Sequence, residues 1–257
     1  MARNRCCAMV RAYTASVMDP FVAMLIFTTA SGSCILIGGL IAMVERIRPL
    51  WLEQEFRHTL IAFGGGVLIA AIAFVLVPEG QEYFRSPKLG VVLFLLGGLV
   101  FMFVERYLSS RQHELPQTIA LLLDFIPESL AMGGMFALGS VSAPLLALFI
   151  GLQNLPEGFN AYREILAVAG ERKQKTLSIM SFMILPGPIA GILGWYIAPG
   201  FPEFVGASML FASGGILYLL FQDIAPQSRL DRHWAPTLGA VVGFCLAWIA
   251  NLLVIGH

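Results

Sequence analysis

The chain has 257 residues, of which 58% are hydrophobic and 12% are charged, and its mean hydropathy is +0.79. Because soluble domains carry about 25% charged residues, this composition excludes an ordinary soluble domain and predicts an integral membrane protein. The formal net charge of zero argues against a nucleic-acid partner and against a polybasic lipid-binding surface.

Eight apolar segments are each close to the length of about 20 residues that a helix needs to cross a bilayer. In chain order they cover residues 20–44, 59–78, 88–107, 115–139, 142–167, 175–198, 203–224 and 235–256. They are too long and too uniformly apolar to be the strands of a membrane barrel. The expected fold class is therefore an all-α integral membrane bundle of eight transmembrane helices, with an amino-terminal tail over 1–18 and one helical domain over 19–257.

Lysine and arginine collect in alternate loops, which predicts the orientation of the bundle. The loops after the first, third, fifth and seventh segments hold most of them: Arg46, Arg48, Arg57, Arg106, Arg111, Arg163, Arg172, Lys173, Lys175, Arg229 and Arg232. By the positive-inside rule these loops face the cytoplasm, and both termini face outward. The expected location is the inner membrane of a bacterium.

Two pairs of segments resemble each other. "FGGGVLIAAIAFVLVPEG" at 63–80 is similar to "FASGGILYLLFQDIAPQS" at 211–228, and "DFIPES" at 124–129 is similar to "QNLPEG" at 153–158. The members of each pair would cross the membrane in opposite directions. This pattern is typical of transporters built from inverted repeats, with the substrate site near the membrane midplane where the repeats meet. We therefore expect segments 1–3 and 6–8 to be related around the central fourth and fifth segments.

The fourth and fifth segments also carry the acidic groups that are most costly to bury. Asp124 and Glu128 are four residues apart and share one helix face, and Gln153 and Glu157 repeat this spacing. An ionised side chain at the centre of the bilayer costs about 3 kcal/mol, and no lysine or arginine lies at the same depth to neutralise these groups. A divalent cation or a proton could do so. The sequence therefore predicts a cation site between the two helices.

Other polar residues leave two interpretations open. Asn160 and Glu164 continue the stripe of Gln153 and Glu157, and could line an exit path or be interfacial residues at a helix end. Asp223 in the seventh segment could likewise be a ligand or a solvated helix end.

These motifs resemble those of the ZIP (zinc–iron permease) family of divalent-metal transporters. The family carries H-N-x-P-E-G-like motifs in helices 4 and 5, to which "DFIPES" and "QNLPEG" are similar, and the resemblance extends over nearly the whole membrane region. It implies eight helices, both termini outside, and a metal site formed by Asp124, Glu128, Gln153 and Glu157. Asp124 stands where the family commonly has histidine.

The resemblance also implies a second, adjacent metal position at Asn154, bridged through Glu157. Here the sequence departs from the family: Phe125 replaces a polar ligand, and Gly187 stands where an acidic residue is common. We therefore expect a single-metal site. Its carboxylate and amide oxygens suit manganese or iron better than an imidazole site does, although zinc is the usual substrate implied by the family.

The expected function is a permease that moves a divalent cation (zinc, iron or manganese) into the cytoplasm. The alternative is a degenerate relative that senses metal or acts as a scaffold without transport. No H-E-x-x-H or G-x-S-x-G motif is present, so an enzyme is not expected, nor is an organic cofactor. The expected partners are the divalent cation and the lipid bilayer, with a second copy of the chain, as a homodimer, a further candidate.

Overall fold

The computed structural model describes residues 18–44, 50–110, 116–170, 172–230 and 233–255. The expected tail over 1–18 lies outside these residues except for Met18. The described residues form helices, turns and one isolated β-bridge between Leu230 and His233. The helical elements are α2 (Pro20–Val44), α3 (Leu50–Ala71), η1 (Ile72–Leu76), α4 (Val77–Glu82), α5 (Pro87–Ser110), α6 (Pro116–Ala137), α7 (Ala143–Val168), α8 (Lys173–Phe182), α9 (Pro186–Ile197), α10 (Pro202–Leu219), η2 (Leu220–Ile224), α11 (Ala225–Ser228) and α12 (Ala235–Ile255).

Seven helical stretches of the described chain are long and apolar enough to cross a membrane. The protein is therefore a multi-pass, all-helical membrane protein, as its composition predicts. The remaining long helix, α7, has 26 residues but carries several buried polar side chains, among them Gln153, Asn154 and Asn160. It lies inside the bundle, where protein rather than lipid surrounds these groups.

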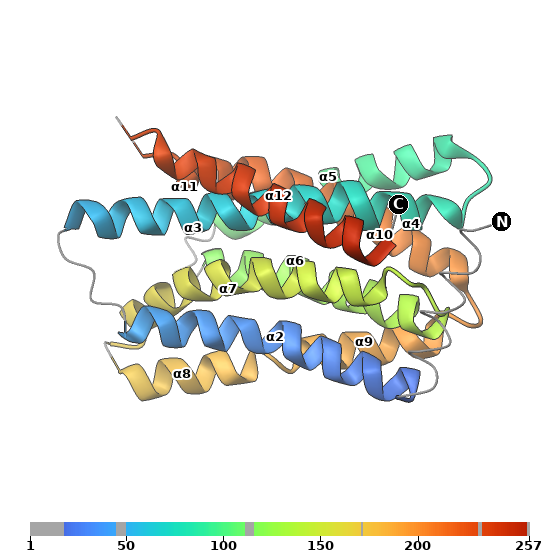
Figure 1. Ribbon diagram of the computed structural model, residues 1–257, viewed down its shortest axis with the longest axis horizontal. Coiled ribbons are helices and arrows are strands. Elements are labelled where there is room, and N and C mark those ends of the chain that lie inside the picture. The colour runs from blue at the N-terminus through green and yellow to red at the C-terminus, as the bar shows by residue number, and fades with distance from the viewer. Residues whose placement is uncertain (1–17, 45–49, 111–115, 171, 231–232, 256–257) are drawn as a thin grey trace.

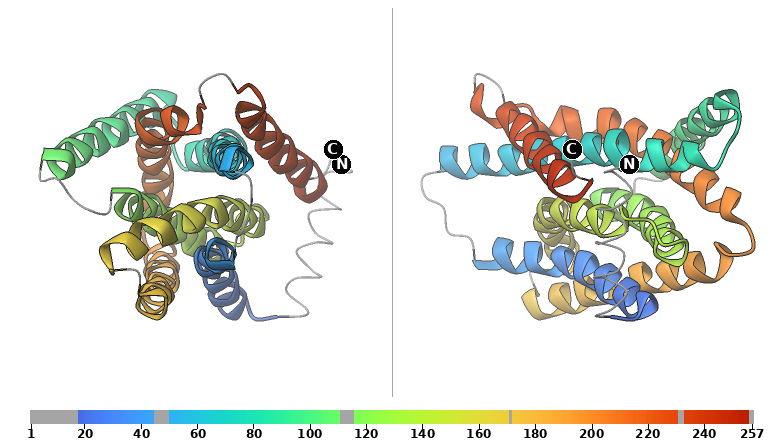
Figure 2. Two further views of the ribbon diagram at one scale, coloured as in Figure 1. Left: turned by 90° about the vertical axis from the view of Figure 1, so that its left-hand side faces the viewer. Right: turned by 45° about the vertical axis from the view of Figure 1, so that its right-hand side comes forward.

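The helices are arranged in layers, with α6 and α7 in the middle (Figure 1). On one side α2 packs along α7 and α9 packs along α6. On the other side α3 and α10 cover the pair, and α12 and α5 pack on the outside of α3 and α10 (Figure 2). Only 17% of the apolar stretch of α5, and the same share of α12, is buried within the chain, so these two helices present the most lipid-facing surface.

Close helix packing depends on glycine at the main contacts. A Cβ atom at Gly38 of α2 would collide with the backbone carbonyl of Leu155 on α7, and one at Gly214 of α10 would collide with that of Phe94 on α5. In a membrane, where burial of apolar side chains drives helix association only weakly, such close backbone approach supplies the van der Waals contact that holds helices together.

Prolines shape three of the crossings. Pro186 begins α9 and separates it from α8, so the segment expected to be one helix over 175–198 is two helices joined by a turn. In the two other crossings a π-helical turn ends two residues before a proline: η1 precedes Pro78, and η2 precedes Pro226. A π turn widens the backbone locally and accommodates the hydrogen bond that the proline nitrogen lacks.

The second crossing begins earlier than expected. Its predicted first residue was 59, but α3 begins at Leu50. The charged residues just before position 59, which the sequence analysis places in a loop, belong to α3. One of them is stabilised there by a side chain of α7. Glu53 forms an ion pair with Arg163 of α7, in which Oε1 of Glu53 lies 2.9 Å from Nη2 of Arg163. The other expected bounds differ from the observed helices by a few residues, and the first crossing matches at both ends.

Candidate metal site

The structure brings together the four residues that the sequence pairs on the fourth and fifth crossings. Gln153 of α7 donates a hydrogen bond from Nε2 to Oε2 of Glu128 on α6, at 2.7 Å. Glu157, one turn further along α7, lies close enough to Asp124 and Glu128 for the three charges to interact. The i, i+4 spacing on each helix therefore places two oxygen-bearing residues of α6 opposite two of α7.

Several acceptor oxygens in this cluster are buried without a hydrogen-bond donor. Asp124 is 4% exposed, and Glu128 and Gln153 are fully buried. Oε1 of Glu128, Oε1 of Gln153 and Oε2 of Glu157 have no hydrogen-bond partner. Buried polar atoms in proteins are almost always satisfied, and an unsatisfied oxygen costs about 1–3 kcal/mol. A set of unsatisfied acceptors is what a cation would require.

In the part of the chain that the structure describes, the ion pairs of basic residues do not involve the cluster. Arg163, the arginine of α7, pairs with Glu53 instead. Among the described residues, no three histidine, cysteine, aspartate or glutamate side chains stand together as a metal-binding group. Two of the carboxylates are engaged with the protein: Oδ1 of Asp124 accepts the backbone N–H of Phe125 at 2.9 Å, and Oε2 of Glu128 accepts from Gln153. A cation that bound to these two oxygens would displace their present partners.

A cavity of about 80 Å³ lies beside the cluster, between four crossings. Asp124 and Glu157 line it, together with Asn160 further along α7. Gly64 and Gly65 of α3 line it too, and a Cβ atom at Gly64 would come within 3.0 Å of Pro156 on α7. A further side of the cavity comes from the seventh crossing, which consists of α10, η2 and α11. Its lining residues are Leu219, Asp223, Ile224 and Gln227. The cavity thus connects the carboxylates of α6 and α7 with the polar end of the seventh crossing.

The structure shows where the residues lie whose interpretation the sequence left open. Asn160 lines the cavity, and its Oδ1 atom is buried without a partner. Asp223 lines the same cavity from η2. Glu164 has a different role: its Oε2 accepts hydrogen bonds from the backbone N–H and the hydroxyl of Thr118, at 2.9 and 2.6 Å, in the first turn of α6. A carboxylate in that place stabilises the amino end of the helix.

Asn154, the second predicted metal position, lies against α2, and its Oδ1 atom is buried without a hydrogen-bond partner. Its Nδ2 donates to the backbone carbonyl of Ser31 on α2, at 3.0 Å. Phe125 of α6 is fully buried next to Gly32 of α2. A Cβ atom at Gly187 of α9 would collide with the ring of Phe125. Phe125 and Gly187 are therefore in contact: the ring fills the space that glycine leaves.

Placing a side chain at position 187 should destabilise the protein, and shrinking the ring should relieve the effect. Gly187→Ala forces a methyl group onto Phe125, and such overpacking costs about 1–3 kcal/mol. In detergent we expect Gly187→Ala to lower the melting temperature, and Phe125→Leu with Gly187→Ala to recover most of the loss. Gly200→Ala, where the nearest atom would be 3.9 Å from the added Cβ, is the control. Strictly additive effects of the two substitutions would contradict the contact.

No model of a known protein family matches the chain, and no curated protein sequence matches it significantly.

Proposed function

We propose that this protein is a divalent-metal permease of the ZIP type, in which one cation at a time passes between α6 and α7. The observation that carries the proposal is the set of buried acceptor oxygens without donors on Glu128, Gln153 and Glu157. Three carboxylates whose charges interact, without a basic partner in their described surroundings, would repel each other strongly in a low-dielectric interior when ionised. A divalent cation offsets that repulsion and satisfies the unpartnered oxygens.

The repeat arrangement supports a transport role. The two π turns lie 148 residues apart in equivalent places, at 72–76 and 220–224, each followed by a proline. The helix contacts are paired in the same way: α2 with α7 corresponds to α9 with α6, and α3 with α12 corresponds to α10 with α5. Helix α2 begins and α12 ends at the same end of the bundle, which favours an even number of crossings (Figure 1). We infer an inverted repeat of eight crossings with the metal site at its centre.

Transport then follows alternating access. The cavity at Asp124 and Glu157 extends toward Asp223 and Gln227, at the end of the bundle where the basic residues collect. That end faces the cytoplasm by the positive-inside rule, with both termini outside and the protein in a bacterial inner membrane. The structure thus resembles a state open toward the cytoplasm. Rotation of Glu128 and Asp124 away from their present partners would form the loaded site, and a proton could take the place of the metal on the return step.

The composition of the site guides the choice of metal. Its side chains offer carboxylate and amide oxygens, and none of them is a histidine. Oxygen ligands suit Mn²⁺ and Fe²⁺, while imidazole favours Zn²⁺. The contact between Phe125 and Gly187 supports one metal position rather than two, because the ring occupies the space between α2, α6 and α9.

A metal sensor or scaffold without transport is the alternative. The lack of a preassembled group of three ligands among the described residues favours it. The two functions differ in one respect, because a sensor binds metal without moving it across the membrane.

Uptake into proteoliposomes tests the proposal. Vesicles containing a metal-sensitive dye are exposed in turn to equal concentrations of Mn²⁺, Fe²⁺, Zn²⁺ and Cd²⁺. We expect saturable uptake above that of protein-free vesicles, lost in Glu128→Ala and kept in Glu203→Ala, an exposed glutamate at the start of α10. Metal binding without uptake would favour the sensor, and neither binding nor uptake would refute both.

A further inference from the structure

A second, chemically opposite cluster lies at the basic end of the bundle, around the amino-terminal part of α3. Two adjoining hollows there share Arg57 and His58 in their walls. Arg163 of α7 lines the first, and Arg229, just after α11, lines the second. Their volumes of about 290 and 250 Å³ are ample for a small anionic group.

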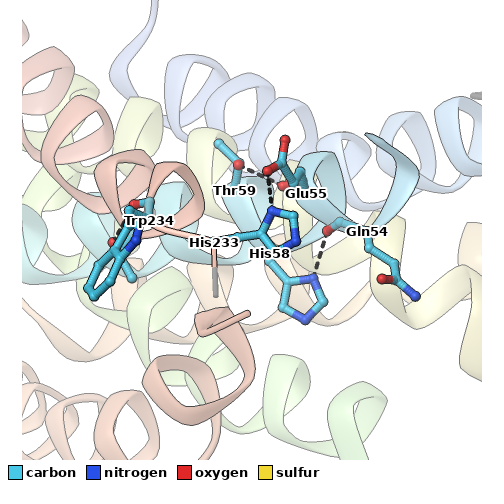
Figure 3. Close-up of polar contacts among 7 residues, drawn as sticks. Gln54, Glu55, His58, Thr59, His233 and Trp234 are labelled. Carbon is cyan, nitrogen blue, oxygen red and sulfur yellow. Dashed lines mark hydrogen bonds and ion pairs between the residues drawn. The ribbon is translucent and has the colours of Figure 1, made fainter. Parts of the chain in front are cut away.

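Two acidic side chains of α3 in this region, Glu53 and Glu55, are already engaged. Glu53 pairs with Arg163, at 2.9 Å. Glu55 binds Nδ1 of His233, at 2.5 Å, which ties α3 to the segment before α12 (Figure 3). Figure 3 also shows His58 on the same helix, with its Nδ1 bound to the backbone carbonyl of Gln54 at 2.6 Å. A carbonyl accepts only, so Nδ1 of His58 carries the proton in this contact.

Arg57 carries a hydrogen-bond donor that no group of the described protein satisfies. Its Nε atom is buried and has no hydrogen-bond partner. Its charged neighbours are Arg163, of the same sign, and Glu53, whose Oε1 is bound to Arg163. Among the described residues, the two hollows are lined by three arginines and one glutamate, which leaves an excess of positive charge even with His58 neutral. A buried guanidinium N–H without an acceptor, beside further positive charge, indicates an absent anion.

We propose that this basic hollow binds a phosphate group. Guanidinium groups match phosphate oxygens in a planar, bidentate geometry that few other anions use as well. The site lies at an end of the crossings, where basic pockets between helices meet lipid headgroups. The same chemistry could come from an anionic lipid headgroup or from inorganic phosphate. The site is separate from the carboxylate cluster, and its test does not depend on metal transport.

Thermal unfolding of the purified protein in a neutral detergent tests the site. One arm titrates sodium phosphate against sodium chloride of equal ionic strength. The other titrates dioleoyl phosphatidic acid against dioleoylglycerol, which has the same acyl chains without the phosphate. We expect phosphatidic acid to raise the melting temperature, and dioleoylglycerol not to. A rise with inorganic phosphate as well shows that the phosphate group alone suffices, whereas a rise with the lipid only shows that the headgroup is bound together with its chains.

Variants test whether the rise in melting temperature comes from binding in the basic hollow. In Arg57→Gln the ligand concentration for half the maximal shift should increase at least tenfold, with a smaller increase in Arg57→Lys, which keeps the charge but loses the Nε donor. Arg229→Gln removes an exposed side chain, so it should fold normally and also weaken binding. Arg85→Gln, between α4 and α5, should behave like the wild type. No shift with either ligand, or an equal loss in Arg85→Gln, would overturn the proposal.

Discussion

Replacing Glu157 with glutamine is expected to reduce metal uptake about a hundredfold or more, because second-shell changes alone typically cost 10–100-fold and Glu157 is proposed as a ligand. The same change should leave the metal-free protein at least as stable to heat as the wild type. Its Oε2 is buried without a partner, and its charged neighbours are Asp124 and Glu128. Removing one of three like charges relieves repulsion in the empty cluster.

The opposite signs of these two effects separate a ligand from a structural residue. Uptake is measured in proteoliposomes, and melting temperature in detergent with and without added metal. The wild type should be stabilised by metal, and Glu157→Gln should not be. The control Glu203→Gln changes an exposed glutamate of the same kind and should keep both properties. A Glu157→Gln protein that transports normally, or one that melts far below the wild type without metal, would contradict the ligand role.

Replacing Asp124 with histidine is expected to shift selectivity toward zinc. Asp124 is almost fully buried, and the adjoining cavity of about 80 Å³ gives an imidazole room. Since imidazole favours zinc over manganese, we expect the ratio of Zn²⁺ to Mn²⁺ uptake to rise about tenfold. Competition between the two metals in the uptake assay measures this ratio directly.

A histidine elsewhere in the same cavity provides the control. Asp223→His alters the opposite wall, on η2, and should change the ratio much less if the metal sits between α6 and α7. Equal shifts in both variants would mean that the cavity as a whole, and not the cluster, sets selectivity. An unchanged ratio in Asp124→His would remove Asp124 from the ligand set.

The positions of most crossings could be predicted because the sequence marks both ends of an apolar run. The first helix begins at Pro20 and ends at Val44, immediately before the charged residues Glu45 and Arg46. For the second crossing the predicted start, residue 59, is too late, because the start depends on a tertiary contact that the sequence does not show. Its first turns carry charged residues, which usually indicate a loop between transmembrane helices. Here Glu53 pairs with Arg163 of α7, which is remote in sequence.

The breaks in the helices show the same limit. The prolines that cause them are visible in the sequence, yet their consequences differ. Pro127 and Pro156 lie inside continuous helices, Pro186 separates two helices, and Pro78 and Pro226 each follow a π turn. Which outcome a proline produces depends on how neighbouring helices satisfy the freed backbone groups, and this is a property of the packed bundle.

The membership of the site was predictable from helical spacing, whereas its hydrogen bonding was not. Spacing of four residues places Asp124 above Glu128, and Gln153 above Glu157, but only the crossing geometry brings Gln153 to Glu128. For the same reason Asn154, adjacent to Gln153 in sequence, points to α2 instead. The sequence offers Asp223 as a possible ligand, but its place in the cavity wall depends on the π turn of η2, which the sequence does not predict.

Locating the cation itself tests the central claim most directly. Anomalous X-ray scattering from the protein crystallised with Mn²⁺ or Zn²⁺ would show where the ion binds. We expect one ion per chain, about 2.0–2.6 Å from carboxylate oxygens of both α6 and α7, with the hydrogen bond between Gln153 and Glu128 broken or rearranged. An ion bound elsewhere, or carboxyl groups that keep their present partners at saturating metal, would contradict the account.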